Sequence, residues 1–255
     1  MAETTAIAVG TLSWVDLASA DIESSKAFYG GLFGWTAHVT PEPEAGGYTM
    51  FKKDGKEVAG VGPKMGDDAP EQWTSYVSID DAKATASKAA KAGGRILMEP
   101  MEVMAAGTMA VLMDPTGAVI ALWQPGEHKG AELFNSPGSL SWNELATRDV
   151  PAAENFYSEV FGWRPETSGD GAGAYTTFKL GDRHIGGLID MDDKGVPHEI
   201  PPHWLPYFTV EDCAGTAAKA EELGGKVMKE PTKIPAGTFA VITDPRGAAF
   251  AVISE

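Results

Sequence analysis

Cysteine is nearly absent from this chain of 255 residues, which contains only Cys213. A single cysteine excludes an internal disulfide and any cysteine-rich metal cluster. Long apolar runs are also missing, because no stretch approaches the roughly 20 residues that a membrane-spanning helix needs. The segment Met1–Gly10 has neither Lys nor Arg and no clear cleavage site. We therefore expect no secretory signal, no membrane partner and a cytoplasmic location.

Positive charge is scarce. The chain has 20 Lys and Arg against 36 Asp and Glu, which gives a net charge of −16. Nucleic-acid binding needs local positive charge to replace counterions, and the sequence has no basic cluster. It also has no glycine-rich phosphate loop after a strand and no G-x-S-x-G elbow. We therefore expect no nucleic-acid partner and interpret the acidity as a solvated surface.

The chain does contain an internal duplication. Residues 14–35 read WVDLASADIESSKAFYGGLFGW, and residues 142–163 read WNELATRDVPAAENFYSEVFGW. Both segments share an opening Trp, an acidic residue two positions later, a Phe-Tyr pair and a closing Phe-Gly-Trp. Later motifs recur in the same order, including DPTGA at 114–118 and DPRGA at 244–248. So many ordered matches indicate two copies of one unit.

The composition of the chain between the copies places the domain boundary. Residues 126–138 are rich in Gly, Pro and charge, which is typical of a linker. The predicted organisation is a first domain at 8–125, this linker, and a second domain at 139–255.

Each copy divides again by pattern. Strand Leu12–Leu17 leads into a helix that begins near Ile22, and three extended segments follow. The same order recurs from strand Thr74–Ile79, whose helix at Asp81–Ala92 stops at a Gly-Gly pair. The DPTG turn at 114–117 is typical of a hairpin. The sequence thus predicts an α+β fold built from four βαβββ units in two tandem domains.

This order resembles that of the vicinal oxygen chelate superfamily. The likeness rests on D-x(6)-F-Y-x(3)-[FL]-G-[WF] along the first helix of each copy and on D-P-x-G before the last strand. Glyoxalase I, extradiol dioxygenases, fosfomycin-resistance proteins and bleomycin-binding proteins belong to this superfamily. More narrowly, the chain is similar to the two-repeat glyoxalase-like proteins of actinobacteria. The resemblance implies two open barrels, each enclosing a cavity.

The metal site of the superfamily is where the chain departs from the pattern. Members with a metal typically use a His on the first strand, a His on the strand that opens the second unit, and a Glu on the final strand. Such ligands hold a divalent ion with open positions. We therefore predict no metal and no cofactor in either copy, because the corresponding positions are Trp14, Thr74 and Ala121 in the first copy and Trp142, Leu205 and Ala251 in the second.

The histidines offer no replacement site. His198 and His203 lie in the Pro-rich stretch VPHEIPPHW, and their spacing fits no standard metal motif. We interpret them as surface loop residues. Cys213 stands where a helix should begin, and we interpret it as a packed or capping residue rather than a nucleophile.

Strand geometry indicates what lines the cavities instead. Side chains two apart on a strand share a face, so Asp16 should accompany Trp14 into the first cavity. A carboxylate beside Trp in a dry cavity should have a raised pKa, which suits a general acid or base. The catalytic candidates are Asp16, Glu144 and His184. The ligand-binding candidates are Trp14, Trp142, Thr74, Tyr76, Tyr207 and Trp123.

Structural roles remain open for the same residues. The Trp and Tyr side chains can equally belong to a core, and His184 can be a surface residue of its strand, where the first copy has Glu57. Asp16 and Glu144 can hold a loop or a helix start by hydrogen bonds. Tyr29 and Tyr157 belong to the helix motif and are interpreted as packing residues.

Three functions compete. The first is an acid/base enzyme of isomerase, cyclase or lyase type, which would act without a metal on a small, fairly apolar or aromatic molecule of specialised metabolism. The second is a non-catalytic binding or sequestering protein of the antibiotic-resistance type, for which aromatic walls suffice. The third is a metal-dependent glyoxalase or dioxygenase. In each case the partner is a small molecule, and the protein is expected to be a monomer or a homodimer.

Overall fold

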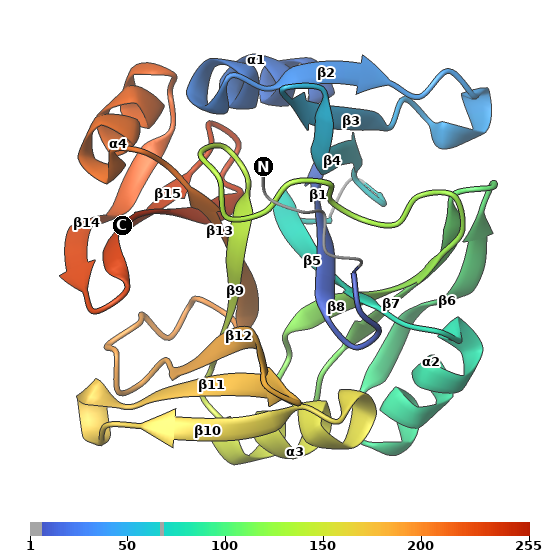
Figure 1. The fold of residues 1–255 in the computed structure, drawn as a ribbon, viewed down its shortest axis with the longest axis vertical. Helices are drawn as coiled ribbons and strands as arrows, with labels where there is room; N and C mark the ends of the chain where they lie inside the picture. Colours follow the sequence, from blue (N-terminus) through green and yellow to red (C-terminus); the bar gives the residue numbers. More distant parts are fainter. Residues whose placement is uncertain (1–6, 67–68) are drawn as a thin grey trace.

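The computed structural model describes residues 7–66 and 69–255, and it shows two mixed eight-stranded sheets, one from each copy (Figure 1). This arrangement confirms the α+β class and the four βαβββ units. The order of strands along the first sheet is β2-β3-β4-β1-β5-β8-β7-β6, and along the second it is β10-β11-β12-β9-β13-β16-β15-β14. Residues 1–6, on which the expectation about a secretory signal partly rests, lie outside the described residues.

The bounds of the elements follow the sequence pattern closely. The first copy consists of β1 (Leu12–Ser19), α1 (Ile22–Phe33), β2 (Thr36–Val39), a short 3-10 helix (Pro43–Ala45), β3 (Thr49–Lys53), β4 (Lys56–Pro63), β5 (Gln72–Ser78), α2 (Ala82–Lys91), β6 (Arg95–Val103), β7 (Gly107–Met113) and β8 (Val119–Pro125). The second copy consists of β9 (Leu140–Thr147), α3 (Val150–Phe161), β10 (Arg164–Ser168), a short 3-10 helix (Gly171–Gly173), β11 (Tyr175–Leu180), β12 (Arg183–Asp190), β13 (His203–Thr209), α4 (Cys213–Glu222), β14 (Lys226–Ile234), β15 (Gly237–Thr243) and β16 (Ala249–Ser254). None of the helices in the described residues has both the length and the apolar character needed to cross a bilayer.

The repeated helix motif marks where α1 and α3 begin and end. Asp21 and Asp149 precede them, and each carboxylate accepts a hydrogen bond from the backbone N–H three residues later. Gly34 and Gly162 follow the two helices with φ of 70° and 73°. That left-handed conformation favours glycine, so the glycine of the Phe-Gly-Trp motif ends each helix.

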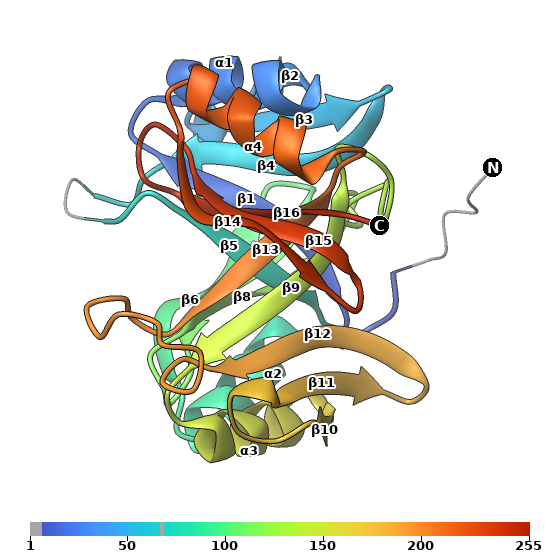
Figure 2. The ribbon, with the colours of Figure 1, turned by 90° about the vertical axis from the view of Figure 1, so that its left-hand side faces the viewer.

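The two sheets contact each other through their central strands, β5 and β8 of the first sheet and β13 and β16 of the second. Ser75 of β5 donates to the side-chain oxygen of Asn143 of β9 over 2.7 Å, and both residues are buried. Helices α1 and α4 lie together at one end of the molecule, and α2 and α3 at the other (Figures 1 and 2). Each of the two large hydrophobic cores therefore combines the first unit of one copy with the second unit of the other.

The DPxG turns fasten the copies to each other. Oδ1 of Asp114 accepts from three backbone N–H groups of its own turn, while Oδ2 accepts from the hydroxyl of Tyr157 in α3 over 2.8 Å. In the other direction, Oδ2 of Asp244 accepts from Tyr29 in α1 over 3.1 Å. Tyr29 and Tyr157 are fully buried, so they pack as expected, and each also forms a polar link between the copies.

Candidate functional site

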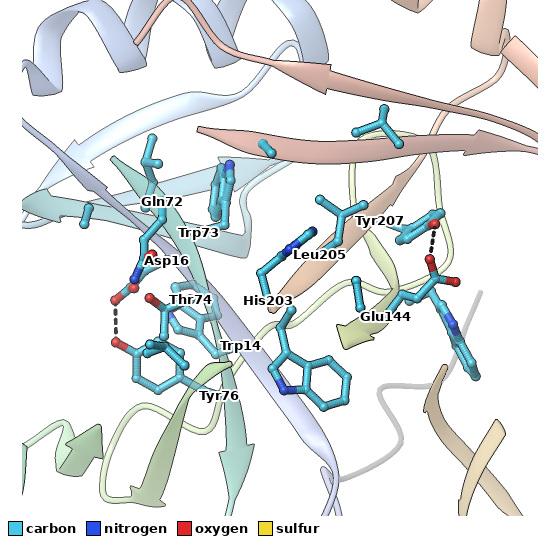
Figure 3. Close-up of a pocket in the computed structure, with 18 of the residues that line it drawn as sticks. Trp14, Asp16, Gln72, Trp73, Thr74, Tyr76, Glu144, His203, Leu205 and Tyr207 are labelled. Carbon is cyan, nitrogen blue, oxygen red and sulfur yellow. Dashed lines mark hydrogen bonds between the residues drawn. The ribbon is translucent and has the colours of Figure 1, made fainter. Parts of the chain in front are cut away.

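The inner faces of the two sheets, opposite the helices, line a continuous hollow of about 2940 Å³. On β1, Trp14 and Asp16 face this hollow, whereas Val15 points into the core on the opposite face. Figure 3 shows the two carboxylates far apart in the hollow, each joined to a tyrosine of the neighbouring strand. The hollow thus contains two polar centres, which we call the Asp16 centre and the Glu144 centre. We call the parts of the hollow around them the first and the second cavity, respectively.

The Asp16 centre is a short network of hydrogen bonds. Oδ2 of Asp16 accepts from the hydroxyl of Tyr76 over 2.8 Å and from that of Tyr48 over 3.3 Å. The indole N–H of Trp14 in turn donates to the Tyr48 hydroxyl over 3.1 Å. Because both hydroxyls bind the same oxygen, Oδ1 has no hydrogen-bond partner among residues 7–66 and 69–255. That oxygen is the one available to a ligand.

Burial sets the protonation of this centre. Desolvation raises the pKa of Asp16 from its ordinary 3.8 to about 6, against the opposing effects of the Tyr76 and Tyr48 hydrogen bonds and the nearby His128. The pKa values of Tyr48 and Tyr76 are raised well above 10 by desolvation and by the adjacent carboxylate. The phenols therefore stay protonated while Asp16 titrates near neutrality, as a proton-transfer group requires.

A glycine makes room for Tyr48. Gly60 of β4 lies beside Asp16 of β1 in the parallel register, and a Cβ at this position would overlap the Tyr48 hydroxyl. Gly187 of β12 has the same relation to Tyr175 and Glu144. The Gly that recurs on this strand in both copies thus lets a tyrosine ring cross the strand and reach the carboxylate.

The Glu144 centre repeats the arrangement in the second copy. Tyr207 donates to Oε1 of Glu144 over 2.9 Å, and the indole N–H of Trp142 donates to the Tyr175 hydroxyl over 2.9 Å. Desolvation raises the pKa of Glu144, opposed by the hydrogen bonds of Tyr207 and Tyr175 and by the charge of Lys194. Both copies therefore hold a carboxyl whose protonated form is favoured by burial.

The first copy has a component that the sequence did not reveal. His128, in the segment between the two sheets, places its ring 4.5 Å from that of Trp14, and its Nδ1 lies 3.2 Å from Glu57 of β4. The backbone oxygen of His128 accepts from the indole N–H of Trp123 over 3.0 Å. Its side chain is only 15% exposed. His128 thus joins the wall of the Asp16 centre.

The remaining sequence candidates are distributed unevenly. Thr74 lies opposite Asp16 in the β1–β5 register, at the hollow. His184 is exposed near the start of β12, three residues before Gly187, which pairs with Glu144. The structure thus brings Trp14, Asp16 and Tyr76 into one centre and leaves His184 at the rim.

One interpretation of the histidines is wrong. His203 is the first residue of β13 rather than a surface loop residue, and its side chain lines the hollow (Figure 3). Desolvation lowers its pKa. The error has a local cause, because the prolines that precede His203 hid the start of the strand.

The residues of the Asp16 centre do not fit the divalent metal ion that the resemblance to the vicinal oxygen chelate superfamily implies. Of the three positions expected to correspond to metal ligands in the first copy, Trp14 and Ala121 lie on either side of Tyr76 across β1, β5 and β8. Thr74 lies two residues from Tyr76 and opposite Asp16. Among the described residues, no group of three or more His, Cys, Asp or Glu side chains is placed to hold a metal ion. The Asp16 carboxylate and the protonated phenols of Tyr48 and Tyr76 do not form a suitable ligand set for a divalent cation, which is usually coordinated by several charged or imidazole ligands.

Two tandem open sheets built from βαβββ units, each with a polar centre on its inner face, define a glyoxalase-type fold. In agreement, the profile of the Glyoxalase/Bleomycin resistance protein/Dioxygenase superfamily matches residues 11–122 and 139–252. The chain belongs to this superfamily.

Known relatives span nearly the whole chain. The anthracycline biosynthesis protein DnrV of Streptomyces peucetius is 41% identical over 98% of this chain and 94% of its own length. CFP32 of Mycobacterium bovis, which is named provisionally as a glyoxylase, is 41% identical over 96% of this chain and 94% of its own. Among solved structures, the Mn(II)-bound glyoxalase of Novosphingobium aromaticivorans has a TM-score of 0.67 at 18% identity, covering 97% of this chain and 82% of that one. At that identity the likeness concerns the fold alone.

Proposed function

We propose that the protein is an acid/base enzyme that acts, without a metal ion, on a small and largely apolar or aromatic molecule. The observation that carries the proposal is the Asp16 carboxyl, whose pKa lies near 6 and whose Oδ2 accepts from two phenols. Its Oδ1 has no partner within the part of the chain that the structure describes. The relative named for anthracycline biosynthesis supports a role in specialised metabolism. The reaction class is an isomerisation, cyclisation or elimination, because acid/base catalysis can drive each of them without an oxidant or a reductant.

The chemistry assigned to the centre is a proton relay within one substrate. Asp16 in its carboxylate form removes a proton from a carbon next to a carbonyl group, and the electron pair of that C–H bond moves toward the carbonyl oxygen. The protonated Asp16 then returns the proton to a different atom. Tyr48 and Tyr76 donate to the carboxylate when it is charged, which keeps its pKa near neutrality rather than higher.

An exchange assay tests this step without knowledge of the natural substrate. α-Tetralone, an aromatic ketone with exchangeable protons beside its carbonyl, is incubated with the protein in D2O and followed by proton NMR. We expect exchange that rises with pH through about 6, because the base must be deprotonated. Asp16→Asn should lose at least tenfold of the rate if the first cavity works, whereas the exposed Asp80→Asn serves as the matched control. Exchange that survives in Asp16→Asn, Glu144→Gln and the double variant refutes the proposal.

The apolar walls favour a second candidate, which is binding without turnover. Trp14, Tyr76 and Trp123 are nearly buried in one cluster on the inner face of the first sheet, and aromatic surfaces alone can hold a flat ligand. Under this alternative, Trp14→Ala weakens ligand binding while Asp16→Asn leaves it unchanged, and no product forms on long incubation.

A further inference from the structure

Methionine is concentrated in one wall of the hollow. The chain has 10 methionines, and seven of them line the hollow from the first copy, chiefly on β6 and β7. Met101 lies opposite Met109 in the β6–β7 register, and Met109 lies opposite Trp123 in the β7–β8 register. We call the surface formed by Met98, Met101, Met109 and Met113 the methionine wall. It runs from the edge strand β6 to the aromatic cluster beside Asp16.

The second copy has no such wall at the same register positions. Phe239 of β15 stands where the first copy has Met109. Its partner on β14 is Thr232, which stands where the first copy has Met101. Lys229 lies further along β14 and places its ammonium 5.7 Å from the centre of the Phe239 ring. The inner face of the second sheet thus lacks the methionines of these positions and carries a cation, so the two cavities favour different ligands.

The methionine wall is incompletely covered by the protein itself. Met101 is 48% exposed, and Met98, Met109 and Met113 are only partly buried. An uncovered apolar surface of this kind marks a binding site. Methionine side chains are unbranched and flexible, so they adapt to varied shapes, and their sulfur gains about 0.3–1.5 kcal/mol against an aromatic ring. That gain favours a ring system over an alkyl chain of equal area.

We propose that the first cavity takes a polycyclic aromatic compound bearing a hydroxyl or carbonyl group, with its rings against the methionine wall and its oxygen toward Asp16. The placement of the oxygen rests on the proposed function. The ring class and the choice of the first cavity over the second rest on the methionine wall and on its loss in the second copy.

Titration with quinizarin, a dihydroxyanthraquinone, tests this inference through its visible absorbance and through quenching of tryptophan fluorescence. Met109→Gln keeps the length and flexibility of the side chain but adds an amide that must lose water under the rings. We expect Met109→Gln to weaken binding about tenfold and the exposed Met101→Gln, which poses little risk to folding, to weaken it several-fold. The matched control is Phe239→Gln at the equivalent position of the second copy, which should change the Kd less than twofold.

Several results would overturn the inference. For the variants, these results are unchanged quinizarin binding in both methionine variants, weaker quinizarin binding in Phe239→Gln, or an effect of Met101→Gln on oligomeric state alone. For the wild type, they are tighter binding of palmitate than of quinizarin, or no quinizarin binding up to its solubility limit. The proposed function fails separately. If the methionine variants lose quinizarin but Asp16→Asn, Glu144→Gln and the double variant still exchange α-tetralone, the ring class stands and the acid/base role falls. The reverse pattern preserves the role and discards the ring class.

Discussion

Replacing Asp16 with asparagine removes a charge from the first cavity while leaving an oxygen that can accept from both tyrosine hydroxyls. The pKa of the carboxyl is raised from 3.8 to about 6 in the folded protein, and a tenfold change in proton affinity is worth about 1.4 kcal/mol. The folded chain thus holds this proton about 3 kcal/mol more tightly than the unfolded chain. Asp16 is only partly buried, so water screens part of this effect, and about 3 kcal/mol is its upper bound.

The sign of the effect follows from proton linkage. Below about pH 3.8 both folded and unfolded chains carry the proton, so the raised pKa costs no stability. As the pH rises to about 6 and beyond, the wild type loses up to about 3 kcal/mol, because the charged carboxylate is poorly solvated in the folded state. Asparagine does not titrate. We therefore expect Asp16→Asn to be about as stable as the wild type near pH 4 and more stable by about 1–3 kcal/mol at pH 8. The gain can fall below 3 kcal/mol because the buried amide of the variant also loses water.

Urea unfolding at a series of pH values measures this difference. The exposed Asp80→Asn variant is the control and should stay within about 0.5 kcal/mol of the wild type. A variant that gains stability while losing the exchange reaction would show that the carboxylate is retained for function at a cost in stability. If Asp16→Asn is instead less stable than the wild type at pH 8, Asp16 is a structural anchor, and the reasoning behind its proton-transfer role is wrong.

Three further predictions concern the same network and the contact between the copies. Tyr76→Phe removes the strongest hydrogen bond that lowers the pKa of Asp16, so the midpoint of the exchange reaction should rise by roughly one pH unit; an unchanged midpoint argues against the network. His128→Ala should raise the same midpoint by a smaller amount, because the charge of His128 also lowers that pKa, and a downward shift would contradict this. Tyr157→Phe leaves Oδ2 of the buried Asp114 without its donor, so urea unfolding should show a loss of about 1–3 kcal/mol, and undiminished stability would show that water replaces the hydroxyl.

Local sequence patterns predicted most of the fold, because the repeated motifs act locally. Asp21 and Gly34 bound α1 through contacts within a few residues, so the helix motif predicted its own start and end. Asp114 was predicted only as a turn residue, since the turn uses just one of its two oxygens. The other oxygen binds Tyr157, which is far away in the sequence. A hydrogen bond between residues so far apart in the sequence leaves no local pattern. The contacts that hold the two copies together therefore could not be predicted.

The candidate site was predictable where it depends on strand alternation. The alternation put Trp14 and Asp16 on one face, which is where the structure has them. Tyr48 was missed because it precedes β3 and reaches the carboxylate only by crossing Gly60. The recurrence of this Tyr and this Gly in both copies was a signal that could have revealed the network. His128 had no such signal, because the chain returns to the site through a segment outside the repeats.

The central claim is that the first cavity holds a carboxyl poised near neutral pH for proton transfer. Carbon-13 NMR titration of the Asp16 carboxyl, assigned by the disappearance of its signal in Asp16→Asn, tests it most directly. We expect the carbon-13 signal of the Asp16 carboxyl to titrate with a midpoint near pH 6. A midpoint at or below the ordinary value of 3.8 would contradict the account, because an Asp16 that is fully ionised throughout the neutral range is not a poised acid or base.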